Sequence, residues 1–275
     1  MKTKIFRRIC SLLLMTSAFS FIAFSKDEIA QSIWAASPLT IDGSNADWQD
    51  MTMNLMKKVE VDYAFKNDAQ YLYVFFVFKN PKFMSTVRAT GITLWFRTEG
   101  KDKKTYGINF KQKQVSGEEL IAILERQPEG ISEEQKKQLK PEASYLAFLG
   151  EVVDKKGKII APEALGGEVE APVFKQKLER TGVSYEFRLP LNILEKLSAE
   201  LRLEPGKSAN IGFEWGGMTK ELLERKVSQA EQKMDLSKDE GAMREGDFGG
   251  GAPSVRRGTQ KYSFWVGVQL AQSQQ

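Results

Sequence analysis

The stretch that decides the fold is "LTIDGSNADWQDM", residues 39–51. A short β-type pair leads into Asp42-Gly43, and a polar segment then closes on Asp47-Trp48. The Asp-Gly pair predicts a turn, because glycine adopts backbone angles that are costly for other residues. Trp48 at the end of a polar turn has two interpretations: a ring that plugs the end of a hydrophobic core, or a ring exposed for a ligand.

Residues 1–25 have the layout of a secretory signal peptide. A basic start precedes an apolar run over residues 9–24, and small residues precede a cleavage point before Lys26. The run is short for a membrane span. We therefore expect a chain that is exported to the periplasm or secreted, and that keeps no membrane span once the leader is cleaved. An uncleaved N-terminal anchor is the alternative. Residues 26–38 are predicted to form a tether.

The charge of the leader changes the charge argument for the rest of the chain. The sequence has 40 Lys and Arg against 36 Asp and Glu, and four of those cations but no acid lie in residues 1–25. The remaining chain therefore has 36 cations against 36 anions. The basic balance belongs to the leader and gives no reason to expect a nucleic-acid partner.

Cysteine and histidine usage excludes several kinds of site. The single cysteine, Cys10, lies within the leader, and the sequence contains no histidine. The mature chain thus has no disulfide, no thiol nucleophile and no Ser-His-Asp triad. Catalysis would have to rest on carboxylates, lysine or tyrosine, so we predict that the protein is not an enzyme.

Period-2 alternation of apolar and polar residues dominates the rest of the chain and predicts strands. These segments are residues 59–68, 71–81, 182–194, 209–217 and 261–271, and residues 91–113 are predicted to form a hairpin with a charged tip. The segment 71–81 is apolar on both faces and is predicted to be a central strand. The segment 182–194 is predicted to be a strand that ends at Pro190 and is followed by a short helix. Many short strands with turns between them predict a single antiparallel, jelly-roll-like β-sandwich over residues 39–272.

Two segments interrupt the β pattern and are predicted to be insertions, at about 116–150 and 219–260. In the first, Ser116 and Ser132 each open a capping box, which predicts two short helices. The second contains a helix or arm followed by a glycine-rich part, residues 241–260. We interpret that part as a surface loop, and a ligand-covering lid is the alternative.

With this order of strands, "IDGSNADW" resembles the opening motif of the family 9 carbohydrate-binding modules and their DOMON-like relatives. Further segments resemble that family in the same order: "NDAQYLYVFFVF", "GITLWFRTEG", "GVSYEFRLPLNIL" and "FWVGVQL". The resemblance spans residues 39–270 without the two insertions. It implies a jelly-roll-like β-sandwich that binds sugars through tryptophan and neighbouring polar side chains. It also favours the core-plug interpretation of Trp48.

Strand parity suggests where a poly- or oligosaccharide would bind. In "GITLWFRT" and "KYSFWVGVQL", Trp95 and Trp265 alternate with the apolar residues and therefore share a face with polar ones. A polar face that carries tryptophan suits sugars, because their C–H faces stack on indole. The candidate ligand-binding residues are Trp95, Trp265, Arg97, Glu186, Arg188 and Gln269. The alternative is that the inserted helices cover this face and bury both tryptophans.

Three other functions remain open at this point. Glu186 and Glu214 could form a carboxylate pair of a glycoside hydrolase, although no motif surrounds them. The resemblance allows calcium, and it also allows a b-type haem for electron transfer; without histidine, Met84 or Met218 would ligate the iron together with a lysine. The third alternative is an envelope domain that binds a protein partner.

Overall fold

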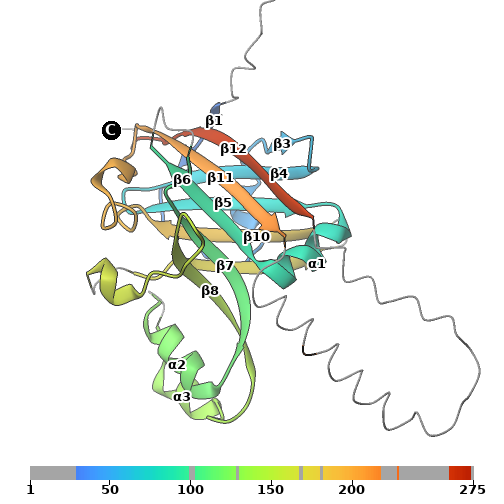
Figure 1. Ribbon diagram of the computed structural model, residues 1–275, viewed down its shortest axis with the longest axis vertical. Coiled ribbons are helices and arrows are strands. Elements are labelled where there is room, and N and C mark those ends of the chain that lie inside the picture. The colour runs from blue at the N-terminus through green and yellow to red at the C-terminus, as the bar shows by residue number, and fades with distance from the viewer. Residues whose placement is uncertain are drawn as a thin grey trace, which may run out of the picture.

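The computed structural model describes residues 29–98, 103–127, 130–166, 170–179, 182–217, 228 and 260–273. The leader and nearly all of the predicted insertion at 219–260 lie outside these residues. Within them, two sheets are stacked face to face (Figure 1). Within the same residues, no helix is long and apolar enough to cross a membrane.

Sheet A has the order β1-β12-β11-β6-β7-β8. Its strands are β1 (Ile29–Gln31), β6 (Ile92–Arg97), β7 (Tyr106–Val115), β8 (Tyr145–Asp154), β11 (Ser208–Gly216) and β12 (Lys261–Gln269). Sheet B has the order β2-β4-β5-β10-β9, and β3 pairs with β4. Its strands are β2 (Ile33–Trp34), β3 (Asn54–Met56), β4 (Val61–Asn67), β5 (Tyr71–Phe78), β9 (Val173–Glu179) and β10 (Gly182–Pro190).

The core lies between the two sheets and follows the predicted alternation. Phe76 of β5 stacks on Phe213 of β11 with 4.8 Å between ring centroids, and Phe213 stacks on Phe264 of β12 at 5.0 Å. All three side chains are buried. Aromatic pairs at these distances add to the free energy gained by burying apolar area. The predicted β-sandwich is therefore confirmed, with β5 as a central strand of sheet B.

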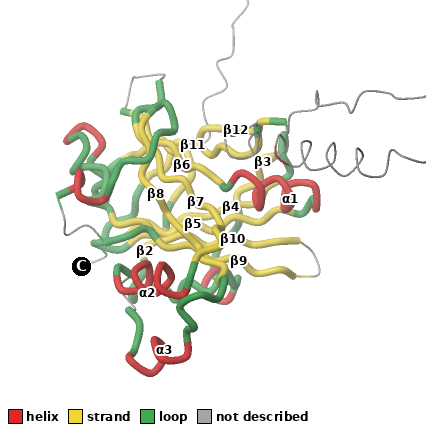
Figure 2. The backbone as a smooth tube through the Cα atoms, turned by 60° about the horizontal axis from the view of Figure 1, so that its bottom comes forward, coloured by secondary structure: helices red, strands yellow, loops and turns green. Residues whose placement is uncertain are grey.

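In the described part of the chain, three α-helices accompany the sheets: α1 (Pro81–Thr90), α2 (Gly117–Glu125) and α3 (Glu133–Gln138). The predicted caps are present, because Ser116 Oγ accepts from the backbone N–H of Glu119 and Ser132 forms a complete capping box with Gln135. Figures 1 and 2 show α2 and α3 at the far end of the long β7–β8 hairpin. Three short 3-10 helices, η1 (Ala46–Trp48), η2 (Pro162–Leu165) and η3 (Ala199–Leu201), lie in connections.

The structure corrects four sequence predictions. The predicted tether contains β1, which pairs in parallel with β12, and β2, which pairs in parallel with β4. The end of the first predicted insertion, residues 145–150, belongs to β8, which pairs with β7 over its whole length. Turns occupy residues 191–197, where a helix was predicted, because bonds such as those from Ile193 N–H to the Pro190 carbonyl and from Leu197 N–H to the Leu194 carbonyl span three residues and not the four of an α-helix. The sequence reading also missed α1, which follows directly after β5.

Candidate functional site

The outer face of sheet B is closed by a covering segment, residues 35–53, which contains the opening motif. Ala35, Ile41 and Trp48 pack there with outward side chains of sheet B in a second hydrophobic cluster, separate from the main core. Trp48 stacks on Phe75 of β5 at 5.2 Å and is 3% exposed. The ring of Trp48 therefore fills the space between this segment and the sheet, which is the core-plug interpretation.

Glu186 holds the covering segment in place. Its Oε1 accepts a 2.9 Å hydrogen bond from Trp48 Nε1, and its Oε2 accepts 3.0 Å bonds from the backbone N–H groups of Asp42 and Gly43. Gly43 has a φ of +79° at this turn, which glycine adopts without strain. The Asp47 carbonyl is fixed separately, since it accepts a 2.7 Å bond from Lys66 Nζ.

Burial raises the pKa of Glu186 above its ordinary value, although its three N–H donors act in the opposite direction. The side chain is completely buried. A completely buried carboxylate whose hydrogen bonds all come from N–H groups of the fold is not accessible to a ligand. Glu186 therefore joins the covering segment to sheet B.

Arg188 lies on the same closed face. Its Nη2 is 3.5 Å from Glu170 Oε1, and its guanidinium carbon lies 5.2 Å from the ring centroid of Tyr71. The expectation that Glu186 and Arg188 would share a surface with the two tryptophans is therefore wrong, because both belong to β10 of sheet B. The same placement separates Glu186 from Glu214, which faces outward on the other sheet, so the two cannot flank one glycosidic bond.

The outer face of sheet A brings the other candidates together. Trp95 pairs with Gly107 of β7 on one side and Gly212 of β11 on the other, and Gly212 in turn pairs with Trp265 of β12. One row across four strands therefore reads Gly107, Trp95, Gly212, Trp265, and we call it the glycine–tryptophan row. The two indoles are about 10 Å apart, since β11 lies between their strands and neighbouring strands are about 4.8 Å apart.

Each glycine of the row lies beneath an indole. A Cβ at Gly107 would lie 2.7 Å from Trp95 Cε3, and a Cβ at Gly212 would lie 2.7–2.8 Å from three indole atoms of Trp265. Those distances are too short for real contacts, so a larger residue would push each ring away. The missing side chains let both indoles lie against the backbone of the neighbouring strand.

Cations lie over both rings. Lys104 Nζ is 3.7 Å from the ring centroid of Trp95, and the guanidinium carbon of Arg97 is 4.4 Å from that of Trp265. Trp95 is only 4% exposed and its Nε1 has no hydrogen-bond partner among the described residues, whereas Trp265 is partly exposed. Both cations lie close enough for cation–π attraction.

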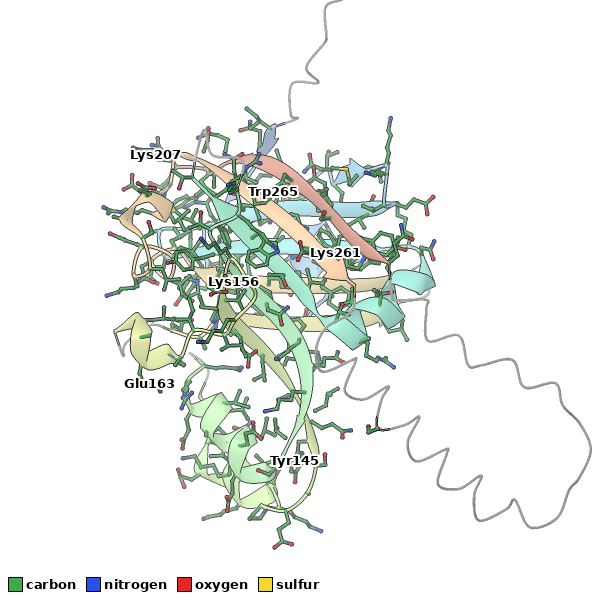
Figure 3. The ribbon with its side chains drawn as sticks, viewed as in Figure 1. Tyr145, Lys156, Glu163, Lys207, Lys261 and Trp265 are labelled. Atoms are coloured by element: carbon green, nitrogen blue, oxygen red, sulfur yellow. The ribbon has the colours of Figure 1, made fainter. Side chains whose placement is uncertain are left out.

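Polar side chains continue along the neighbouring row of the same face. Glu214 lies between two lysines, with Oε2 3.4 Å from Lys104 Nζ and 2.9 Å from Lys261 Nζ. Asn109 donates a 2.9 Å bond to Thr93 Oγ1. Figure 3 shows the labelled Trp265 and Lys261, four residues apart on β12 and so on one face.

Gln269 lies on this face but at the far end of β12. Its Oε1 accepts a 2.7 Å bond from Ser208 Oγ, and its Nε2 donates a 2.8 Å bond to the Gly206 carbonyl. It lies about 13 Å along the strand from Trp265, at roughly 3.3 Å per residue. Of the six predicted residues, the structure therefore brings together Trp95, Trp265 and Arg97.

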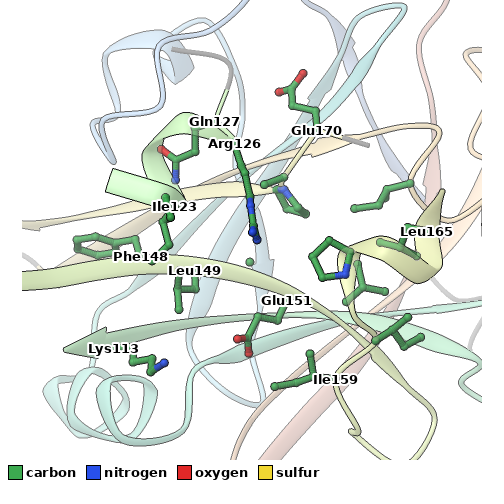
Figure 4. Close-up of a pocket in the computed structure, with 18 of the residues that line it drawn as sticks. Lys113, Ile123, Arg126, Gln127, Phe148, Leu149, Glu151, Ile159, Leu165 and Glu170 are labelled. Atoms are coloured by element: carbon green, nitrogen blue, oxygen red, sulfur yellow. The ribbon is translucent and has the colours of Figure 1, made fainter. Parts of the chain in front are cut away.

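Two clefts border the β7–β8 hairpin. One, of about 450 Å³, extends from Trp95 and Glu214 past Asn109 to the end of α1. The other, of about 490 Å³, lies between α2, β8 and η2, and Figure 4 shows Arg126 pointing into it. Lys113, Glu151 and Ile159 line both clefts, so the two adjoin.

The helices of the first insertion, α2 and α3, do not lie over the tryptophans, and nearly all of the second insertion lies outside the described residues. α2 packs on β8, and in Figure 1 both α2 and α3 are remote from β6, β11 and β12. Sequence reasoning missed Lys104, Lys261 and the two glycines of the row. The signal was available, because Gly107 and Gly212 have the same outward parity in "YGINF" and "NIGFEW" as the two tryptophans have in their strands.

The cofactor predictions fall largely outside the described part of the chain. The side chain of Met84 and the whole of Met218 are not described. Within the described residues, no group of three or more acidic side chains is arranged to hold a metal ion.

Comparison with solved structures finds proteins of similar fold. A family 9 carbohydrate-binding module from Caldicellulosiruptor kristjanssonii, in complex with glucose, is 13% identical, with a TM-score of 0.31 over 71% of this chain and 81% of that one. The structure of such a module in complex with cellotriose is 12% identical, with a TM-score of 0.34 over 71% of this chain and 80% of that one. A protein from Bacteroides uniformis ATCC 8492, provisionally assigned to carbohydrate binding, is 13% identical, with a TM-score of 0.33 over 70% of this chain and 84% of that one.

The first two structures belong to the family whose opening motif this sequence resembles. At these identities and TM-scores the likeness concerns fold alone, and no residue or ligand is carried over from it. No protein-family model matches the sequence, and no curated protein matches it.

Proposed function

We propose that this protein is an exported, non-catalytic module that binds a poly- or oligosaccharide on the outer face of sheet A. The observation that carries the proposal is the glycine–tryptophan row, in which two indoles lie against glycine backbone on one face. Flat aromatic surfaces held in this way suit the C–H faces of pyranose rings. The leader-like residues 1–25 support export.

The neighbouring polar groups suit the hydroxyls of a sugar. Glu214 offers acceptor oxygens, while Asn109, Lys104 and Lys261 offer donors, and all four lie on the face that carries the indoles. Indoles about 10 Å apart exceed the width of one pyranose ring, so a ligand that contacts both has at least two sugar residues. The cleft of about 450 Å³ beside Trp95 offers room for the chain to continue.

Removal of a ring tests the proposal. The wild-type protein is screened on a glycan array, and the affinity for the best ligand is then measured by calorimetry for Trp265→Ala. We expect a loss of about tenfold or more, equivalent to 1.4 kcal/mol. Trp34→Ala is the matched control, since this partly exposed tryptophan lies on β2 of the other sheet.

A second variant tests the orientation of the ring without removing it. Gly212→Ala places a methyl group where Trp265 lies, whereas Gly267→Ala on the same face meets only Ile29 Cγ1, at 3.5 Å. We expect Gly212→Ala to weaken binding about fivefold to tenfold, or roughly 1 kcal/mol, and Gly267→Ala to have little effect. Binding that survives both Trp265→Ala and Trp95→Ala would place the ligand on another surface and overturn the proposal.

A further inference from the structure

The cations over the indoles occupy the positions that a neutral sugar would need. The inner face of each ring lies on glycine backbone, so only the outer face can receive a ligand. Lys104 lies 3.7 Å above Trp95, and Arg97 lies 4.4 Å above Trp265. A sugar ring stacked at van der Waals distance would fill the same space as these cations. Binding therefore requires Lys104 and Arg97 to move aside.

A ligand that displaces these cations must give them a new partner. A cation loses its attraction to the ring when it moves, and a neutral hydroxyl returns a hydrogen bond but no opposite charge. A carboxylate returns an ion pair together with the hydrogen bond, and an arginine can bind it through two parallel bonds. The exchange therefore favours a saccharide that carries its own negative charge.

The charges on this face leave cations for such a ligand. Glu214 is shared between Lys104 and Lys261, at 3.4 Å and 2.9 Å, so one carboxylate serves two ammonium groups. Arg97 adds a third cation two residues along β6 from Trp95. Among the described residues beside the glycine–tryptophan row, these three cations against one anion leave two positive charges. An acidic ligand would neutralise them.

We propose that the outer face of sheet A recognises an acidic oligosaccharide built from uronic acids. The inference rests on the proposed saccharide-binding function and adds the charge of the ligand to it. A pyranose ring stacks on an indole in place of the displaced cation, and its carboxylate pairs with Lys104 or Arg97. Because these two cations lie over different tryptophans, each sugar position has its own cation to pair with the carboxylate of the sugar.

Methyl esterification provides a matched neutral ligand. Tetramers of galacturonate, glucuronate and mannuronate are each titrated against the full-length protein, beside their methyl esters. We expect at least one acid to bind about tenfold more tightly than its ester, because only the acid forms an ion pair with the displaced cation. The gap should shrink as salt is raised from 0.05 M to 0.5 M, because screening weakens the exposed pairs.

Substitution of the cations locates the anion. We expect Lys104→Gln and Arg97→Gln to weaken acid binding severalfold and to narrow the difference in affinity between acid and ester, because the carboxylate of the acid loses its partner. Lys79→Gln is the control, because Lys79 is also ion-paired, with Asp62 at 2.7 Å, but lies at the end of β5 in sheet B. Acid binding that ignores both substitutions would overturn the inference.

The outcomes separate this inference from the proposed function. If neutral saccharides bind as tightly as the acids and Trp265→Ala abolishes that binding, the inference fails while the proposed function stands. If neither the acids nor the neutral glycans of the array bind, both fail. If the acids bind more tightly and binding depends on both a ring and its cation, both stand.

Discussion

Tryptophan rings lie on the outer faces of both sheets, but the two faces use them differently. On sheet B, Trp48 lies between the covering segment and β5, and its Nε1 donates to a buried carboxylate. On sheet A, Trp95 and Trp265 lie against glycine with cations above them. The indole on sheet B is enclosed by backbone that the fold fixes, whereas the proposed site on sheet A depends on indoles covered by side chains that can move.

The acidic residues beside these rings differ in the same way. Glu186 accepts three hydrogen bonds from N–H groups that the fold holds in place. Glu214 pairs with lysines whose side chains are 32% and 54% exposed. Partners of the first kind cannot be exchanged without moving the chain, whereas lysine side chains can rotate away. A site that must release its own contacts to bind a ligand needs partners that can rotate away, as these lysine side chains can.

The largest effect that separates the two faces is expected from Trp48→Ala. Loss of a buried tryptophan costs about 3–5 kcal/mol of unfolding free energy. Urea denaturation of this variant beside Trp265→Ala measures the contrast, and the second variant should lose much less stability because its ring is partly exposed. Equal losses in the two variants would mean that both faces are structural.

A smaller loss of stability is expected from Glu186→Gln. The amide keeps one acceptor oxygen but directs an NH₂ group at N–H donors, so at least one buried donor loses its partner. Such a loss costs about 1–3 kcal/mol. Glu214→Gln is the matched control, and its partly exposed pairs should contribute about 1 kcal/mol or less. A loss for Glu214→Gln as large as that for Glu186→Gln would contradict the contrast between fixed and exchangeable partners.

Strand alternation was sufficient to predict the β-sandwich and the outward parity of the two tryptophans. The pattern is local, since it depends only on residues i and i+2, and β6 and β12 carry it clearly. The opening motif was equally informative, because a tryptophan at the end of a polar turn is stabilised by burying its ring in a hydrophobic core. These features can be read from the sequence without knowing which strands pair.

The assignment of strands to sheets could not be predicted in the same way. Glu186 and Arg188 alternate in β10 as Trp95 and Arg97 do in β6, yet β10 pairs with β5 and β6 pairs with β11. Parity gives the face within a strand and says nothing about the sheet to which the strand belongs. The parallel pairing of β1 with β12 joins residues more than 230 positions apart, and no local pattern announces it.

The finest difference between the faces is expected in the pH dependence of stability. Burial raises the pKa of Glu186 in the folded protein above its ordinary value of about 4.3. A group with a raised folded pKa contributes stability that is present at low pH and is lost as pH rises through that pKa. The difference in unfolding free energy between wild type and Glu186→Gln should therefore shrink as pH rises above about 4.3.

Asp50 provides the opposite case, since its hydrogen bond to Lys66 lowers its pKa and its contribution to stability is lost as pH falls. Urea midpoints of wild type, Glu186→Gln and Asp50→Asn from about pH 2 to 8 measure both trends, because the contribution of Asp50 is lost below its ordinary pKa of 3.8. A gap for Glu186→Gln that widens with pH would show that the three N–H donors outweigh burial, and that the carboxylate is stabilised in its charged form.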